Sequence, residues 1–231
     1  AVLPALQKGN TMKFPDYCVI LIFMLYRCSG PSVVTGDGGA TETVNAQVII
    51  TDTIISVKID SDTLISADIM LFDINYNPAY QSGYKDSVHV TSKDTIITYK
   101  ANPGIYNLLI LTRENNKSLA VKNLNPGTGK QEVINDTLTP NGAIQGKIIT
   151  GAFSNDNNIY FKLYITGTPF FTEVSNENFE LSGIPAGTYH LEISMCSNDR
   201  TSDKNYSKIL GRDIDVIAND TTTGIELFIS N

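Results

Sequence analysis

The chain has 231 residues and carries 24 acidic against 17 basic side chains, a net charge of −7. Its length allows one or two domains, and 42% apolar with 18% charged residues is typical of a folded globular protein. The acidic balance and the lack of a Lys/Arg cluster argue against a nucleic-acid partner, because phosphate contacts need a basic surface. Three cysteines and two histidines are too few for a disulfide framework or a zinc site.

The first segment of the chain has the pattern of an export signal. The sequence begins with Ala1, and Met12 is the better start. Lys13 supplies a positive charge, and Cys18–Tyr26 is an unbroken apolar run, which suits a signal core and is about half of a membrane span. We therefore expect a signal peptide over residues 12–27.

The signal is followed by Cys28 and a polar, Gly/Thr-rich stretch, which predicts a flexible tether over residues 28–45. This arrangement resembles a bacterial lipoprotein signal, in which the cysteine is lipidated and becomes the mature N-terminus. The resemblance implies lipidation at Cys28 and a membrane partner through that anchor. Ser29 after the cysteine implies outer-membrane sorting. Leu25 fits the family pattern, whereas Arg27 stands where a small residue is usual.

Three other interpretations of this segment stay open. The first is an ordinary secretory signal, the second an uncleaved weak anchor, and the third a cytosolic protein with a chance apolar run. The lipoprotein interpretation places the protein in the bacterial cell envelope, on a side that the sequence does not specify. An envelope protein or a glycan is then the expected class of partner.

The rest of the chain has strand patterns and no sustained helical period. Residues 60–62 read as a turn, and residues 75–84 as a loop with Pro and Gly breakers. Short strands with turns every ~8–12 residues predict antiparallel sandwiches. The expected strands are residues 46–51, 54–59, 67–74, 88–91, 95–99, 106–112, 119–122, 131–138, 142–149, 159–166, 170–174, 179–181, 189–194, 209–217 and 224–229.

Two short phrases occur twice at a nearly constant offset. Pro103–Leu108 (PGIYNL) reappears as Pro185–Leu191 (PAGTYHL), with the tyrosines 83 positions apart. Val133–Thr137 (VINDT) reappears as Val216–Thr221 (VIANDT), with the aspartates 84 positions apart. A shared offset predicts a duplicated domain. We expect a first, divergent module over residues 46–139 and a second over 140–231.

The second module resembles the carboxypeptidase regulatory-like domains. Gly142–Ile149 (GAIQGKII) is similar to their G-x-I-x-G-x-V opening, and Phe179–Leu191 follows F-x-L-x-x-I-P-x-G-x-Y-x-L. The resemblance implies a seven-stranded, transthyretin-like (prealbumin-like) sandwich without catalysis, since the peptidase's zinc residues have no counterpart. The first module lacks the G-x-I-x-G opening. Tyr106 and Tyr189 resemble corner tyrosines, with the ring buried and the hydroxyl bonded to backbone.

The predicted fold is therefore all-β: two tandem antiparallel seven-stranded Ig-like/transthyretin-like β-sandwiches after a signal and a tether. No nucleophile elbow occurs, and His89 and His190 lie 101 positions apart, so we expect solvent-facing histidines and no catalytic site, cofactor or metal. The predicted function is a non-catalytic cell-envelope lipoprotein with a structural, spacer or interaction role. The alternative is a carbohydrate- or peptide-binding surface module that uses Tyr76, Tyr80 and Tyr84, or the loop at residues 197–207.

Overall fold

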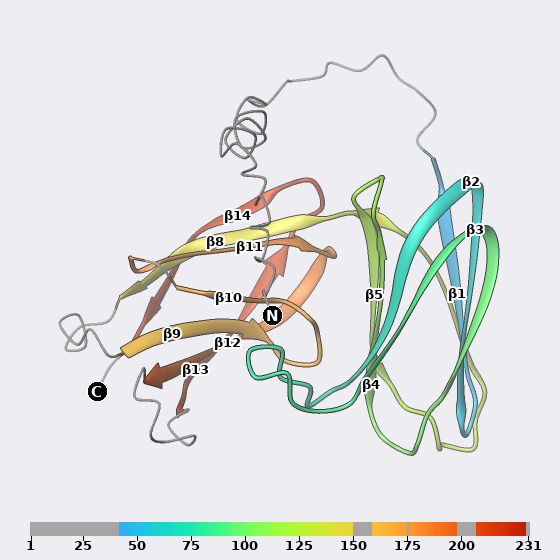
Figure 1. Cartoon of the computed structure of the whole chain (residues 1–231), viewed down its shortest axis with the longest axis horizontal. Helices are drawn as coiled ribbons and strands as arrows, with labels where there is room; N and C mark the ends of the chain where they lie inside the picture. The colour runs from blue at the N-terminus through green and yellow to red at the C-terminus, as the bar shows by residue number, and fades with distance from the viewer. Residues whose placement is uncertain (1–41, 150–158, 175, 198–206, 230–231) are drawn as a thin grey trace, which may run out of the picture. The chain divides into compact units, whose positions relative to one another are not determined.

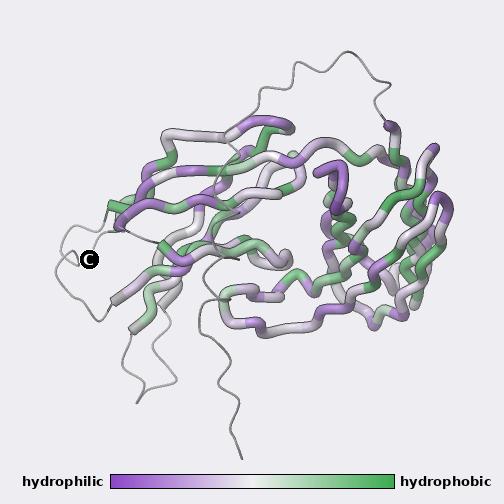
Figure 2. Tube along the Cα trace, turned by 45° about the horizontal axis from the view of Figure 1, so that its top comes forward, coloured by the Kyte–Doolittle hydropathy of each residue, from purple (hydrophilic) through white to green (hydrophobic). Residues whose placement is uncertain are grey.

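A computed structural model describes residues 42–149, 159–174, 176–197 and 207–229, and residues from Glu42 onward belong to one compact unit. The described residues form strands and turns without a helix, which confirms the all-β prediction (Figure 1). Apolar and polar residues alternate along many of these strands (Figure 2), as expected where one face of a sheet covers a core. The predicted signal at 12–27 and lipidation site at Cys28 lie outside the described residues. The first strand begins at Val44, inside the stretch predicted as tether.

The N-terminal half forms a single hydrogen-bonded sheet that folds over its own core. Its strand order is β6-β1-β2-β4-β5-β7, and β3 pairs with β2. The core is made of buried aliphatic side chains from both layers, such as Val57 and Ile69. The strands are β1 (Val44–Ile50), β2 (Ile54–Asp73), β3 (Lys85–Lys100), β4 (Tyr106–Thr112), β5 (Lys117–Leu124), β6 (Glu132–Thr137) and β7 (Thr139–Pro140).

Strand β2 is long because it belongs to both layers. Its first part pairs with β1 and its second part with β4, while β3 follows it along both. The register between β2 and β3 shifts between Asp60 and Ile65, where the hairpin passes from one layer to the other. Residues 60–62 were expected to be a turn between two strands, and that expectation was wrong. Asp60 and Ser61 pair with Asn45 and Val44 of β1, and this pairing continues the strand into these residues.

The C-terminal half is a sandwich of two separate sheets. Their orders are β10-β9-β12-β13 and β11-β8-β14, and all pairs are antiparallel except β14 with β8, which is parallel. Phe161, Leu163 and Ile165 face its core, as the alternation of β9 predicted. The strands are β8 (Gly142–Ile149), β9 (Ile159–Ile165), β10 (Phe171–Glu173), β11 (Asn178–Ile184), β12 (Gly187–Ser197), β13 (Ser207–Val216) and β14 (Thr221–Phe228).

The two halves share one topology. In one layer, β10-β9-β12-β13 corresponds to β3-β2-β4-β5, where β2 and β3 contribute the parts of the hairpin next to the loop at residues 74–84. In the other layer, β11-β8-β14 corresponds to the other end of β3, the first part of β2, and β6. Strand β1 is an insertion between β2 and β6, so β6 has an antiparallel neighbour whereas β14 has a parallel one. This correspondence supports the duplication, and the boundaries at 46–139 and 140–231 remain a prediction.

The two tyrosines of the repeated phrase occupy equivalent places. The Tyr106 hydroxyl donates to the Asn102 carbonyl at 3.0 Å, and the Tyr189 hydroxyl donates to the Pro185 carbonyl at 2.9 Å. Each acceptor lies four residues before its tyrosine, and both rings are buried, so the structural interpretation of these residues is confirmed. The second repeated phrase is not equivalent in the fold. It forms strand β6 in the first half and the turn before β14 in the second.

Candidate functional site

Of the three tyrosines predicted to contact a ligand, Tyr76 is buried. Its side chain is 3% exposed, and its ring lies 5.0 Å from that of Phe72. The backbone carbonyl of Tyr76 accepts a hydrogen bond from the amide of Gly167 at 2.6 Å. This residue therefore joins the loop between β2 and β3 to the turn between β9 and β10.

Tyr80 lies against the C-terminal half as well. Its hydroxyl is 3.3 Å from the sulfur of Cys196, and its ring meets Tyr164 edge-on with the centroids 6.4 Å apart. Burial is the main cause that raises the pKa of Tyr80 well above its ordinary value. Lys162 Nζ donates to the carbonyl of Ala79 at 3.2 Å and lies 5.4 Å from the centre of the Tyr80 ring.

Tyr84 is the exposed member of the three. Its side chain is 45% exposed, and its ring meets Tyr106 edge-on at 6.3 Å. Its hydroxyl donates to Asp86 at 3.5 Å, and partial burial is the main cause that raises its pKa. Ligand contact by this loop stays a prediction, and Tyr84 is the member whose ring a ligand could reach without movement of the loop. Most of the alternative loop at residues 197–207 lies outside the described residues.

Further contacts join the two halves beside this loop. Lys122 Nζ lies 3.5 Å from the centre of the Tyr189 ring and donates to the Thr188 carbonyl, and burial lowers the pKa of this lysine. The buried side chain of Asn107 donates to the Gly167 carbonyl at 3.0 Å. We use the term junction for these contacts, together with those of Tyr76 and Tyr80 and with the adjoining apolar cluster. That cluster comprises Phe72, Tyr76 and Leu109, against which Met70, Leu111, Ala120 and Phe170 pack.

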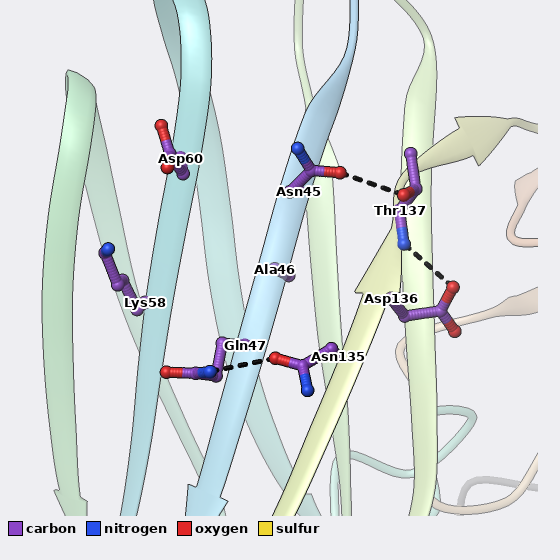
Figure 3. Close-up of a pocket in the computed structure, with 8 residues that line it drawn as sticks. All are labelled: Asn45, Ala46, Gln47, Lys58, Asp60, Asn135, Asp136 and Thr137. Atoms are coloured by element: carbon purple, nitrogen blue, oxygen red, sulfur yellow. Dashed lines mark hydrogen bonds between the residues drawn. The ribbon is translucent and has the colours of Figure 1, made fainter.

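A polar hollow of about 340 Å³ lies on the outer face of strands β6, β1 and β2 (Figure 3). Gln47 Nε2 donates to Asn135 Oδ1 at 2.8 Å, and Thr137 Oγ1 donates to Asn45 Oδ1 at 2.9 Å. The hollow offers amide, ammonium and carboxylate groups without an aromatic ring. Such a surface can hold a polar ligand weakly, because water competes for each hydrogen bond. Its residues are Asn45, Ala46, Gln47, Lys58, Asp60, Asn135, Asp136 and Thr137.

Sequence reasoning found no partner for His89, whereas the fold supplies two, Asp68 and Ser66, and Arg113 in turn binds Asp68. His89 Nδ1 lies 2.8 Å from Asp68, its Nε2 lies 3.4 Å from the Ser66 hydroxyl, and Arg113 donates twice to Asp68 at 3.0 and 3.1 Å. The Arg113 guanidinium is the main cause that holds the pKa of Asp68 below its usual value. The spacing along β2, which puts Ser66 and Asp68 on one face, could be read from the sequence. The pairing of β2 with β3, which brings His89 beside them, could not.

The histidine lies between a serine and an aspartate, as in a nucleophilic triad, but the surroundings of the three residues differ from those of an active site. Strand β2 is paired on both sides here, so its backbone amides are engaged in the sheet rather than aimed at an oxyanion. The side chains of His89 and Arg113 are 44% and 62% exposed, so water is not excluded. We interpret the group as a cross-strand network on the surface. His190 makes a similar contact with Asp213 at 2.7 Å.

Within the part of the chain that the structure describes, no three His, Cys, Asp or Glu side chains are grouped to hold a metal ion. The same residues include no helix of the length and apolarity needed to cross a membrane.

No protein-family model and no curated protein matches the chain. A minor pilin of Streptococcus agalactiae is similar over 74% of this chain and 86% of its own, with 12% identity and a TM-score of 0.32. The major pilin of Bacillus cereus is similar over 82% of this chain and 70% of its own, with 14% identity and a TM-score of 0.26. An adhesin of Mobiluncus mulieris is similar over 82% of this chain and 100% of its own, with 12% identity and a TM-score of 0.21. At these scores the similarities assign neither fold nor function to this chain.

Proposed function

We propose that the chain is a non-catalytic cell-envelope lipoprotein that acts as a stiff spacer or interaction protein. The observation that carries this proposal is the junction. Tandem domains move relative to one another by default, and specific buried contacts between them oppose that motion. Here an apolar cluster and hydrogen bonds from both halves meet, and the loop with Tyr76 and Tyr80 is part of the joint.

The stiffness of the junction is tested by the distance between two nitroxide labels, one on each half. Exposed positions Thr98 and Glu226 are changed to cysteine in a full chain that carries Cys18→Ser and Cys28→Ser, with Cys196 left buried. We expect a narrow distance distribution, which Tyr80→Ala broadens because it removes the contacts with Tyr164 and Cys196.

Tyr84→Ala is the matched control, because it truncates an exposed tyrosine of the same loop and should leave the distribution narrow. A broad distribution in the protein without junction substitutions would refute the spacer role.

Anchoring at Cys28 is tested by the intact mass of the full chain, expressed in a bacterial host and extracted with detergent. We expect the mass of a chain that starts at Cys28 and carries acyl groups, and no such species for Cys28→Ser. An unmodified mass that retains Met12 would mean that Arg27 prevents processing, and the envelope anchor would be rejected while the spacer role stood.

A second candidate function is the binding of a carbohydrate or peptide. The exposed ring of Tyr84 favours it, because a sugar ring or an apolar side chain can stack on such a surface. Binding to an array of glycans and peptides should fall with Tyr84→Ala and persist with Gln47→Ala in the polar hollow. Equal binding by the two variants and the parent protein would exclude Tyr84 as the contact.

A further inference from the structure

Strand β3 is a long free edge. It has sixteen residues, all of which except Lys93 pair with β2, and no other described strand adds to its outer side. An edge of this length presents a row of unpaired backbone amides and carbonyls, which is a template for another strand. On either side of Lys93 and Asp94 the strand is rich in β-branched residues, and Ile96 is 68% exposed.

We propose that β3 pairs with β3 of a second copy of this chain, antiparallel, about a two-fold axis between Lys93 and Asp94. In this register Lys93 lies opposite the partner's Asp94, and Asp94 lies opposite the partner's Lys93. The interface is self-complementary, as a two-fold contact must be. The association goes beyond the proposed function, which concerns a single chain.

The inward and outward residues of β3 restrict its register. Val90 faces the core side before Lys93, and Tyr99 does so after it, whereas Thr91 and Ile96 face outward. The side that faces the core therefore changes from even to odd numbers along the strand, because the hairpin passes between layers here. The proposed register sets Thr91 opposite the partner's Ile96, both outward. A shift by one residue would set outward side chains opposite inward ones.

The charges select among the registers that remain. A shift by one residue also sets Lys93 opposite the partner's Lys93, or Asp94 opposite the partner's Asp94, which is repulsive. A shift by two leaves Lys93 opposite the partner's Ser92 or the partner's Ile96, without an ion pair. Lysine on an edge normally discourages pairing. In the proposed register that charge is matched instead, and Lys93 Nζ already lies at the hairpin, where it donates to the Asp62 carbonyl at 3.1 Å.

The test is sedimentation of the full chain over a hundredfold range of concentration, with Cys28→Ser present throughout to avoid lipidation. We expect a reversible monomer–dimer equilibrium. Lys93→Glu alone, or Asp94→Lys alone, sets like charges opposite one another and should weaken the dimer at least ~10-fold. Lys100→Glu is the matched control, because its residue lies opposite the partner's Ser87 and should change the equilibrium little.

Mixing gives the sharpest result. The Lys93→Glu protein and the Asp94→Lys protein are complementary to each other at both central positions, so a mixture should form a heterodimer more tightly than either variant forms a dimer alone. The double variant Lys93→Glu/Asp94→Lys should regain the dimer of the parent. A parent chain that stays monomeric at all concentrations overturns the proposal. So does a dimer that both single variants form as strongly as the parent.

Discussion

At the scale of single residues, the two corner tyrosines carry the clearest structural role. The Tyr189 hydroxyl is buried and donates to Pro185, and the Tyr106 hydroxyl is half-buried and donates to Asn102. Each bond ties the start of a core strand to the turn before it, β4 in the first half and β12 in the second. Because a buried acceptor left without a donor costs more than an exposed one, the two sites differ in energy.

Replacing these tyrosines by phenylalanine tests that difference. We expect Tyr189→Phe to lower the free energy of unfolding by about 1–2 kcal/mol and Tyr106→Phe by about 0.5–1 kcal/mol. Urea denaturation measures both, and Tyr84→Phe at the exposed position serves as the control with little effect. Equal losses at all three positions would show that the backbone bonds contribute nothing specific.

The corner tyrosines could be predicted from sequence because their partners lie four residues away within one repeated phrase. Tyr76 and Tyr80 could not be placed in the same way. Tyr80 is buried by Tyr164 and Cys196, and both of these residues lie in the other half of the chain. A loop with three aromatic residues has the same local pattern whether it faces solvent or another domain.

At the scale of strands, the glycines of β8 explain why the two halves diverge. A Cβ at Gly146 would lie 2.3 Å from the Ile225 carbonyl oxygen, and one at Gly142 would lie 2.2 Å from that of Ile217. The parallel contact with β14 at Gly146, and the contact with the turn after β13 at Gly142, thus leave no room for a side chain. In the first half β1 stands between β2 and β6, so the corresponding close approach does not arise and the G-x-I-x-G motif is absent.

This account predicts a large cost for a single methyl group. Gly146→Ala should destabilise the protein by about 3 kcal/mol, because backbone atoms of β14 must move. Gly129→Ala is the comparison, since its φ of +72° is strained for alanine but no heavy atom lies near the new methyl, and about 1 kcal/mol is expected. Chemical denaturation of both variants tests this, and a Gly146→Ala cost no larger than that of Gly129→Ala would contradict it.

Strand existence followed from composition and period, whereas strand continuity did not. Residues 106–112 and 142–149 were predicted with the bounds that the structure has. The sequence Asp60-Ser61-Asp62 is typical of turns, yet these residues continue strand β2, in which Asp60 and Ser61 pair with Asn45 and Val44 of β1. Local propensity cannot report that partner.

At the scale of the whole molecule, buried tyrosines link stability to alkaline pH. Burial is the main cause that raises the pKa of Tyr99 and of Tyr189 above the ordinary value of 10.0. The unfolded chain therefore loses these protons at a lower pH than the folded one. The stability that these protonated tyrosines contribute is complete below pH 10. It is lost as the pH rises above 10 and through the pKa values of the folded state.

We expect the free energy of unfolding to fall with increasing slope above about pH 10. In Tyr99→Phe and in Tyr189→Phe the fall should be shallower, because one linked proton is removed. Urea titrations at a series of pH values measure the slope, with Tyr84→Phe as a weaker comparison because Tyr84 is more exposed. Slopes that do not depend on these residues would contradict the linkage.

The buried sulfur of Cys196 makes the rate at which the junction opens measurable. This thiol has no exposed surface and lies beneath the hydroxyl of Tyr80. A thiol reagent can modify it in those molecules whose loop has lifted or whose C-terminal half has opened, so the rate of labelling counts opening events. We expect Tyr80→Ala to speed labelling of the peptide that contains Cys196 at least ~10-fold, and Tyr84→Ala to leave it unchanged. Equal rates in the parent and in Tyr80→Ala would place the rate-limiting opening elsewhere in the C-terminal half.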